Sequence, residues 1–422
     1  MKFYIETYGC TSNFGNSQDV AEALEEKGHV PSSPEEADAV IVNTCAVTEK
    51  TERKILRRLS LLQGKRLVVA GCLSTALPES IRHISCRYRL GLLNRSSAEK
   101  IADLFRHSVS TNPHISTECI PHAPNIAIDC RQDLCGIVNI ATGCNGGCSY
   151  CIVRKARGKL ISRKPIEVTA DVQKLTTSGI VEVQIAAQDT TAYGSDLGTN
   201  LAELLLRLTD VPGDFKMRVG MMNPDTMLPI QKELVRAFRS PKIYRFLHIP
   251  VQSGSNKILN SMGRRYSVED FLEIIGTFRS SYPDVTIITD AIVGFPGETE
   301  RDFRDTLSLI ESLQPDKINI TRFSPRPGTP AAELYDMPDR IKKDRSRELT
   351  RLWLEIAGTR NRRYVGQVLD ARVTECGRGA TMKARSANYT GIVVSGAPDL
   401  GNLCQIKIRG SNPFYLDGIL QL

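Results

Sequence analysis

The chain has 422 residues, of which 41% are hydrophobic, and its 55 Lys and Arg against 47 Asp and Glu give a formal net charge of +8. That length predicts about two or three globular domains, and the composition excludes a disordered or collagen-like chain. No stretch approaches the roughly 18 apolar residues of a membrane helix, and the start of the chain does not have the pattern of a signal peptide.

The 12 cysteines are the most informative feature of the composition. In a chain without an export signal they indicate reduced thiols and metal ligation rather than disulfides. The net positive charge is compatible with a polyanionic partner, although charge alone only suggests one.

The first hundred residues predict alternating strands and helices. Hydrophobic periodicity places strands over Lys2–Thr7, Ala39–Asn43, Arg66–Ala70 and Arg87–Leu93, and helices over Ser17–Lys27 and Thr48–Leu62. Strands and helices that alternate at these lengths indicate a parallel sheet with helices on both faces.

One cysteine follows each of the first three strands: Cys10, Cys45 and Cys72. Because the carboxyl ends of parallel strands gather at one edge of the sheet, we expect the three thiols to meet there. Each alone is equally well explained as a small buried core residue, but three in equivalent positions, beside Gly9 and Gly71, favour a metal cluster. No G-x-G-x-x-G follows the first strand, which argues against a dinucleotide site.

A polar stretch with prolines and no clear periodicity predicts a linker over residues 108–134. It carries Cys119 and Cys130, and Cys135 follows directly. Their spacing matches no metal-binding motif, so we expect a connection and no third metal site there.

Three further cysteines lie in one short loop, Cys144, Cys148 and Cys151, with the spacing Cys-x3-Cys-x2-Cys. Three thiolates hold three irons of a 4Fe–4S cluster and leave the fourth iron open to a ligand. Zinc is the rival metal, but a structural zinc site normally closes with a fourth Cys or His, and none follows nearby. The spacing is typical of radical S-adenosylmethionine enzymes, in which that cofactor binds the open iron.

Six strand–helix repeats between residues 135 and 338 predict a partial α/β barrel. Its strands are expected over Gly136–Ala141, Val181–Ala187, Lys216–Met221, Tyr244–His248, Val285–Val293 and Lys317–Phe323. Chemistry in such barrels takes place at the carboxyl ends of the strands, where the cysteine loop, Gln188, Asp189, His248 and the Gly294–Gly297 turn fall. A cap or a turn is the alternative role for each polar residue alone, and their shared placement argues for a site.

A charged helical connector over residues 339–363 leads into a small C-terminal barrel. The charges of the connector are either a solvated helix face or a surface for a polyanion. Short β-type runs at Val365–Val373, Gly391–Val394 and Leu403–Ile408 predict an antiparallel barrel over residues 364–422. Basic and aromatic side chains expected on its surface suit RNA binding; these are Lys383, Arg385, Tyr389, Lys407 and Arg409.

Motifs in all three regions resemble the methylthiotransferase family. They are Thr7–Cys10 (TYGC), Asn43–Cys45 (NTC), Gly71-Cys72, the Cys144 loop with Ala156–Gly158 (ARG), His248–Ser253 (HIPVQS), Met262–Ser267 (MGRRYS), Asp290–Thr299 (DAIVGFPGET) and Phe323–Pro330 (FSPRPGTP). The resemblance implies a methylthiotransferase N-terminal domain over residues 1–107, a radical S-adenosylmethionine core over 135–338 and, after the connector, a TRAM domain over 364–422. The implied fold class is α/β, with a parallel N-terminal sheet, a partial TIM-type (β/α)6 barrel and a small antiparallel β-barrel.

Within the family, Ala156-Arg157-Gly158 and Gln188–Gly194 (QDTTAYG) resemble the archaeal and eukaryotic tRNA branch. The bacterial pattern usually has a proline shortly before its Arg-Gly pair, where this chain has Arg154 and Lys155. The resemblance implies methylthiolation at C2 of N6-threonylcarbamoyladenosine next to the anticodon of tRNA, which gives 2-methylthio-N6-threonylcarbamoyladenosine. Eukaryotic members carry a C-terminal membrane anchor that is not seen here, so we expect an archaeal-type, soluble, cytoplasmic and monomeric enzyme.

The reaction explains why two clusters are implied. The adenine C2–H is neither acidic nor hydridic, so a general base does not activate it, and a cofactor-derived radical has to remove the hydrogen. By resemblance, one 4Fe–4S cluster on the loop cysteines reduces S-adenosylmethionine, and a second on the three strand-end cysteines carries the sulfur. The implied partners are tRNA, an electron donor of flavodoxin or ferredoxin type and a sulfur source, with no membrane.

Further site residues are implied only by their position in the family's motifs. Contacts to S-adenosylmethionine are implied for Tyr150, Gln188, Asp189, Arg218, Asp290 and Val293. Contacts to the substrate are expected for Arg264, Arg265 and Arg326, which suit the threonyl carboxylate, and for Lys383 and Arg385 in the small barrel.

Three other functions stay open at this point. An enzyme acting on isopentenyladenosine in tRNA would need an apolar pocket where this chain offers arginines. An enzyme acting on an aspartate of a ribosomal protein would have to accept a basic protein, which a basic connector and barrel disfavour. A non-enzymatic iron–sulfur scaffold that binds RNA would need neither open irons nor polar strand ends.

Overall fold

The structure, a computed structural model, describes residues 1–62, 65–106, 134–396 and 398–421. The chain divides into two units. The described residues up to 106 form the first unit together with Cys151–Lys159 and Arg326–Gly328, and the other described residues form the second. Two short stretches of the predicted core therefore pack with N-terminal residues. Residues 108–133 of the predicted linker, which include Cys119 and Cys130, lie outside the described residues. Its last residue, Leu134, is described.

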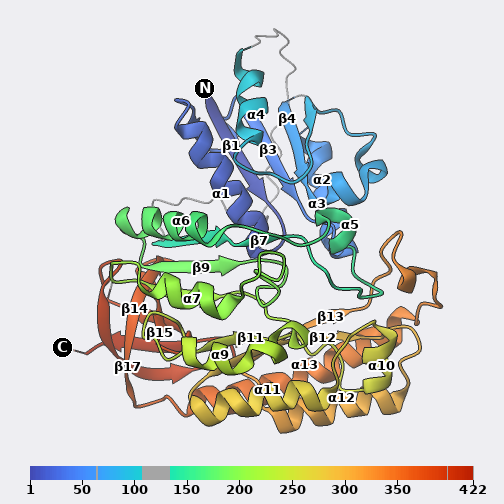
Figure 1. Cartoon of the computed structure of the whole chain (residues 1–422), viewed down its shortest axis with the longest axis vertical. Helices are drawn as coiled ribbons and strands as arrows, with labels where there is room; N and C mark the ends of the chain where they lie inside the picture. Colours follow the sequence, from blue (N-terminus) through green and yellow to red (C-terminus); the bar gives the residue numbers. More distant parts are fainter. Residues whose placement is uncertain (63–64, 107–133, 397, 422) are drawn as a thin grey trace. The chain divides into compact units, whose positions relative to one another are not determined.

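The first unit contains a five-stranded sheet in the order β2-β1-β3-β4-β5 (Figure 1). Its strands are β1 (Lys2–Thr7), β2 (Val30–Pro31), β3 (Ala39–Thr44), β4 (Arg66–Gly71) and β5 (Tyr88–Arg89). Its helices are α1 (Thr11–Glu25), α2 (Glu49–Leu61), α3 (Cys72–Ala76), α4 (Ser97–Arg106) and α5 (Val153–Arg157), with a 3-10 turn, η1 (Pro78–Ile81). Every pairing in this sheet is parallel, which confirms the predicted parallel sheet.

Alternate residues of the central strands pack on opposite faces of this sheet. Ile41 of β3 packs with Leu24 of α1 on one face, and Val42 packs with Ile55 of α2 on the other. Strand β3 is buried along its whole length, as expected of a central parallel strand covered on both faces. Figure 1 shows α1 and α4 on one side of the sheet and α2 and α3 on the other.

Helix α1 begins at Thr11, directly after the first cysteine and earlier than the predicted start at Ser17. The segment between these residues is rich in Asn, Ser and Gly, which are poor helix formers, so its pattern alone does not predict a helix. Tertiary hydrogen bonds hold it instead. The side chain of Asn43 donates to the Asn13 carbonyl at 2.8 Å and to the Ser17 hydroxyl at 2.9 Å.

The second unit contains six barrel strands in two parallel groups, β6-β9-β10 and β11-β12-β13, joined by a parallel bridge between Met217 and Ile243. The strands are β6 (Cys135–Asn139), β9 (Glu182–Ala186), β10 (Lys216–Val219), β11 (Phe246–His248), β12 (Thr286–Val293) and β13 (Lys317–Arg322), with a short hairpin, β7 (Ala141–Thr142) and β8 (Ile161–Ser162). The helices are α6 (Pro165–Thr177), α7 (Leu201–Thr209), α8 (Pro224–Met227), α9 (Gln231–Ala237), α10 (Asn256–Ser261), α11 (Val268–Ser281) and α12 (Glu300–Leu313), with 3-10 turns η2 (Leu228–Ile230) and η3 (Pro330–Glu333). This arrangement confirms the predicted partial barrel.

Helix α13 (Asp339–Arg362) is the predicted charged connector. Its buried Leu349, Trp353 and Ile356 belong to the hydrophobic core of the barrel. One face of the helix is therefore packed, and the opposite face carries the exposed charges.

The C-terminal barrel is closed, with the strand order β14-β15-β16-β18-β17. Its strands are β14 (Val368–Cys376), β15 (Thr381–Ser386), β16 (Gly391–Ser395), β17 (Leu403–Ser411) and β18 (Leu416–Leu420). The sequence patterns did not predict β15 and β18. Strands β16 and β18 pair in parallel, so the barrel is not wholly antiparallel as expected.

This small barrel packs on the amino ends of the strands of the larger one. The Tyr389 hydroxyl donates to Glu182, the first residue of β9, at 2.8 Å, and the Arg245 N–H, directly before β11, donates to the Ala387 carbonyl at 3.1 Å. The carboxyl ends of the barrel strands lie at the opposite end. Among the described residues no helix combines the length and apolarity that crossing a membrane requires.

Candidate functional site

The three strand-end cysteines occupy equivalent places in the first unit. Cys10 is the N-cap of α1, Cys45 follows β3 directly, and Cys72 is the first residue of α3 after β4. Strands β1, β3 and β4 are neighbours in the sheet, so all three residues lie at one edge. Cys10 is exposed, whereas Cys45 and Cys72 are buried.

Two glycines allow this close approach. A Cβ on Gly9 would lie 2.9 Å from the Cys45 Cβ and 3.1 Å from its sulfur. A Cβ on Gly71 would lie 2.5 Å from the Thr44 carbonyl oxygen, and Gly71 has a φ of 96° and a ψ of −163°, a conformation that is essentially restricted to glycine. The sequence therefore needs glycine at both positions for the cysteines to come together.

Asn13 holds the backbone around the cysteines in place. Its side-chain amide donates to the Tyr8 carbonyl at 2.6 Å and to the Thr44 carbonyl at 3.0 Å, so it ties the ends of β1 and β3 together. The Cys72 sulfur lies 3.8 Å from the Asn13 Oδ1. Neither Asn13 nor Asn43 was among the predicted site residues, although Asn43 stands inside the Asn-Thr-Cys motif.

The thiols are suited to a cluster more than to a single ion. Burial raises the pKa of the Cys45 thiol to about 12 and also raises that of Cys72, so binding iron has to displace their protons. Within the described residues, no three His, Cys, Asp or Glu lie close enough to hold one metal ion. Iron–sulfur clusters are held by cysteine thiolates, so a donor set made of three thiols fits such a cluster by its chemistry.

The loop cysteines Cys144 and Cys148 belong to the second unit, and Cys151 begins the segment grouped with the first. A Cβ on Gly146 would lie 3.2 Å from the Cys144 sulfur and 3.8 Å from the Cys148 sulfur, so this glycine lies between the two. Its N–H donates to the Cys144 sulfur at 3.2 Å. Burial raises the pKa of the Cys144 thiol, and this N–H opposes that effect.

Gln188, at the carboxyl end of β9, is brought to this loop as predicted from its position. Its Oε1 accepts from the Gly143 N–H at 2.8 Å. Its Nε2 is buried without a hydrogen-bond partner among the described residues. A buried donor of this kind is costly unless a ligand accepts from it, so the site is suited to a ligand with an oxygen acceptor.

Arg264 connects Tyr150 with Asn223, in the loop after β10. It donates to the Tyr150 hydroxyl at 2.9 Å and to the Asn223 Oδ1 at 3.0 Å. The Asn223 N–H donates to Asp189, which is buried and also accepts from Thr226 at 2.9 Å. Burial raises the pKa of Asp189, and the structure gives its carboxylate a role in holding these loops.

Asp290 of β12 has a different environment. His248 lies 3.0 Å from its carboxylate, and Asn319 donates to it at 2.6 Å. Burial alone would raise the pKa of Asp290, but these hydrogen bonds and nearby positive charge lower it, so the carboxylate is ionised at neutral pH. Val293, at the end of the same strand, is fully buried.

Four predicted basic residues already have partners elsewhere. Arg265 pairs with Asp225 at 2.6 Å, and Arg326, in the first unit, pairs with Glu52 at 2.5 Å. Lys383 and Arg385 share Glu375, at 2.7 and 2.9 Å.

Arg218 is not brought to the carboxyl ends of the barrel strands. Its guanidinium lies over the rings of Phe246 and Tyr389, at 4.9 and 5.5 Å from their centroids, toward the amino ends. Tyr389 packs against Tyr244 and Phe246, so it is not the free surface aromatic that was expected. Of the residues expected on the barrel surface, Lys407 and Arg409 are exposed.

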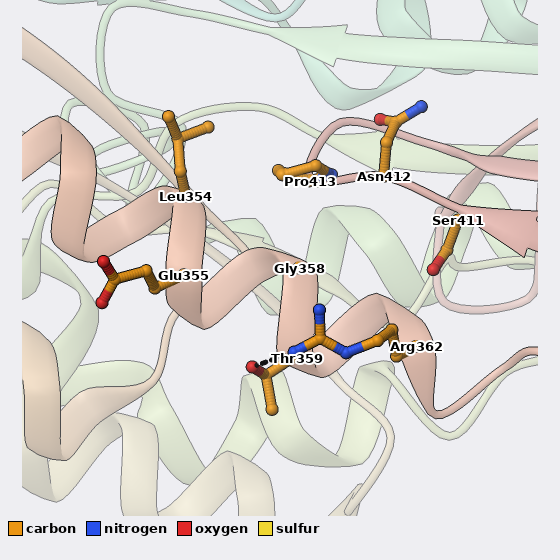
Figure 2. A pocket seen from close by; sticks show the side chains of 8 residues that line it. All are labelled: Leu354, Glu355, Gly358, Thr359, Arg362, Ser411, Asn412 and Pro413. Atoms are coloured by element: carbon orange, nitrogen blue, oxygen red, sulfur yellow. Dashed lines mark hydrogen bonds between the residues drawn. The ribbon is translucent and has the colours of Figure 1, made fainter.

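A hollow of about 410 Å³ lies between the end of α13 and the turn from β17 to β18. Figure 2 shows Arg362 and Thr359 on the helix side and Ser411, Asn412 and Pro413 on the opposite side. It contains none of the predicted site residues, so its chemistry is separate from that of the cysteines.

Three family models match the chain. Residues 2–90 match the Uncharacterized protein family UPF0004, residues 138–310 the Radical SAM superfamily and residues 362–420 the TRAM domain. The Radical SAM match covers the barrel that carries Cys144 and Cys148.

Full-length relatives decide the family. A protein of Archaeoglobus fulgidus named "Probable threonylcarbamoyladenosine tRNA methylthiotransferase" is 41% identical over 427 residues, covering 100% of this chain and 99% of that protein. The chain belongs to the threonylcarbamoyladenosine tRNA methylthiotransferase family. Another member, "Threonylcarbamoyladenosine tRNA methylthiotransferase MtaB" of Thermotoga maritima, is 34% identical and covers 86% of this chain and 84% of that protein. The resemblance seen in the sequence motifs is confirmed.

A solved structure supports the fold of this family member. TsrM of Kitasatospora setae, a radical S-adenosylmethionine methyltransferase solved with cobalamin and a [4Fe–4S] cluster, has a TM-score of 0.56 at 14% identity. The likeness covers 78% of this chain and 77% of that chain. At this identity it concerns the fold alone.

Proposed function

We propose that this enzyme inserts a methylthio group at C2 of N6-threonylcarbamoyladenosine next to the anticodon of tRNA. The observation that carries the proposal is the pair of cysteine triads. One triad gathers at the sheet edge of the first unit, and the other has the radical S-adenosylmethionine spacing in a chain of this family. An enzyme that only generates the radical would need the loop triad alone.

The six cysteines are assigned to two proposed clusters. Cys144, Cys148 and Cys151 would hold one 4Fe–4S cluster, and the three strand-end cysteines would hold the second. When bound, the clusters and S-adenosylmethionine supply the electron, the radical and the sulfur that this reaction needs. The protein supplies position and charge, because no general base removes the C2 hydrogen.

Contacts around the loop give S-adenosylmethionine polar partners. The unpartnered Gln188 Nε2 is a donor for its carboxylate. Asp290, kept ionised by His248 and Asn319, is an acceptor for its ammonium or hydroxyl groups. Tyr150, fixed by Arg264, would orient the cofactor beside the loop. Asp189 and Arg218 have protein partners, so we assign them to loop order and barrel packing.

The threonylcarbamoyl substrate is favoured over isopentenyladenosine because the site offers cations and polar groups. Arg264 lies beside Tyr150, and its guanidinium suits the threonyl carboxylate. Arg265 and Arg326 remain candidates whose charge is shared with Asp225 and Glu52. We further propose that residues 1–107, 135–338 and 364–422 are the three functional domains, with 339–363 as the connector.

The proposed partners follow from the chemistry. The exposed basic face of α13 and the C-terminal barrel would bind tRNA. A flavodoxin or ferredoxin type protein would supply electrons, and a separate source would supply sulfur. We propose a cytoplasmic monomer.

The test uses the full-length protein after anaerobic reconstitution. With tRNA that contains N6-threonylcarbamoyladenosine, nucleoside mass spectrometry should detect the 2-methylthio product. Cys144→Ala should abolish cleavage of S-adenosylmethionine, whereas Cys10→Ala should retain cleavage and lose the product. Cys86→Ala removes another free cysteine of the first unit and serves as the matched control. Thiomethylation by Cys10→Ala protein would refute the two-cluster function.

A strain that lacks the gene tests the substrate. Its tRNA should lose 2-methylthio-N6-threonylcarbamoyladenosine and retain the unthiolated nucleoside. Loss of a methylthio-isopentenyl nucleoside instead would show that the other substrate is the correct one.

A further inference from the structure

Arg157, in the Ala-Arg-Gly stretch, is a buried arginine of the first unit. It is the last residue of the short helix α5. Ile152 and Ala156 of the same segment pack in one hydrophobic cluster with Cys45 and Cys72. The segment therefore brings the guanidinium to the strand-end cysteines.

The guanidinium reaches the cysteines through Asn13. Its Nη2 donates to the Oδ1 of Asn13 and, at 3.2 Å, to the Oδ1 of Asn16. The same Asn13 oxygen lies 3.8 Å from the Cys72 sulfur.

No carboxylate among the described residues forms an ion pair with Arg157, whose hydrogen-bond acceptors are neutral amides. Other partly or fully buried arginines of this unit differ: Arg58 pairs with Glu6 and Arg326 with Glu52. A buried cation without an opposite charge is costly. The groups that supply negative charge at this place are the thiolates of the three cysteines once they bind iron.

We propose that Arg157 is the counter-charge of the cluster held by Cys10, Cys45 and Cys72, and that it retains this cluster and raises its reduction potential. A fixed positive charge favours the more reduced, more negative state of a cluster. Arg157 is in this sense a positioning residue, since it acts through the cluster and its amide neighbours. The inference rests on the proposed function, because it requires a cluster at this site.

The experiment isolates the second cluster in the full-length chain. A Cys144→Ala/Cys148→Ala background removes two loop ligands and leaves residues 151–159 unchanged. Iron analysis should give one cluster per chain, and EPR-monitored redox titration gives its midpoint potential. Adding Arg157→Gln should shift the potential to a more negative value and accelerate loss of iron to a chelator. Outer-shell substitutions typically weaken metal binding by about 10- to 100-fold. Arg157→Lys keeps the charge and should restore most of the potential.

Two further variants provide a control and a second test of the counter-charge. Arg58→Gln removes an arginine whose charge is shared with Glu6, so it should lower thermal stability without moving the potential. Asn16→Asp keeps Arg157 but gives it a carboxylate partner, so it should also lower the midpoint potential of the cluster. This variant tests the inference if Arg157→Gln does not fold. A background protein without any cluster would refute the proposed function. If neither Arg157→Gln nor Asn16→Asp changed the midpoint potential or the rate of iron loss to the chelator, this inference would be wrong and the proposed function would stand.

Discussion

Gly71→Ala tests whether backbone geometry, rather than the cysteines alone, builds the strand-end site. The added Cβ would lie 2.5 Å from the Thr44 carbonyl oxygen and 2.6 Å from its nitrogen. These are backbone atoms of the neighbouring strand and do not rotate away. The φ of 96° and ψ of −163° cost a side chain about 1–3 kcal/mol, and forcing extra atoms into a packed site costs a further 1–3 kcal/mol or so. We expect the first unit to lose about 2–6 kcal/mol.

Gly28→Ala is the matched control, because Gly28 also has a positive φ, of 81°, but nothing lies within 4 Å of its Cβ position. It should cost about 1 kcal/mol or less, since the strain is partly offset by the lower entropy of the unfolded chain. Hydrogen–deuterium exchange of peptides from β3 and β4 measures the local stability. Gly71→Ala should accelerate exchange by about 30-fold or more, since each 1.4 kcal/mol is roughly tenfold. Equal exchange in the two variants would show that the close contact is not decisive.

Three other predictions concern the second unit. Burial would raise the pKa of Asp302, but hydrogen bonds from Thr299, Lys257 and Ser255 hold that pKa well below its ordinary value. The ionised carboxylate therefore stabilises the fold above pH ~4, and this stabilisation is lost as the pH falls below that value. Thermal scans should find Asp302→Asn destabilised at pH 6 and the difference shrinking toward pH 3; a constant difference would contradict this assignment. Tyr389→Phe removes the hydroxyl that donates to buried Glu182, and this loss should lower the stability by about 1–3 kcal/mol. Trypsin should then cleave the C-terminal barrel faster, and an unchanged cleavage rate would argue against this contact. The double variant Lys407→Gln/Arg409→Gln removes two exposed charges and should weaken tRNA binding and reduce its salt dependence; Lys383→Gln, paired with Glu375, should have the smaller effect, and the reverse order would show that pairing does not decide the contribution.

The sequence predicted the strand-end cysteine triad for a physical reason. Strand and helix periods are local, and parallel strands deliver the residues that follow them to one edge. Cys10, Cys45 and Cys72 needed only that rule, although they are far apart in the sequence. The partial barrel and the connector helix followed from the same local patterns.

The sequence could not predict interactions that depend on where a long side chain ends. Arg218 lies in a predicted strand, but its guanidinium turns toward Tyr389 and Phe246, which belong to other elements. Arg326 pairs with Glu52, a partner that its place in the motif at Phe323–Pro330 does not reveal. The early part of helix α1 is held by Asn43, a residue of β3, whose side chain donates to the Asn13 carbonyl and to the Ser17 hydroxyl. In each case the deciding partner is distant in sequence, and local propensity carries no information about it.

The Ala-Arg-Gly stretch illustrates how the two kinds of information combine. In the sequence, Arg157 served only to distinguish one branch of the family from another. In the structure it ends α5, in the same short segment that begins with Cys151. That segment therefore carries a predicted ligand of one cluster and, by our inference, the counter-charge of the other. Cys151 lies two residues before Val153, the first residue of α5. An insertion inside α5 would therefore change the spacing between Cys151 and Arg157, whereas an insertion after Gly158 would leave it unchanged.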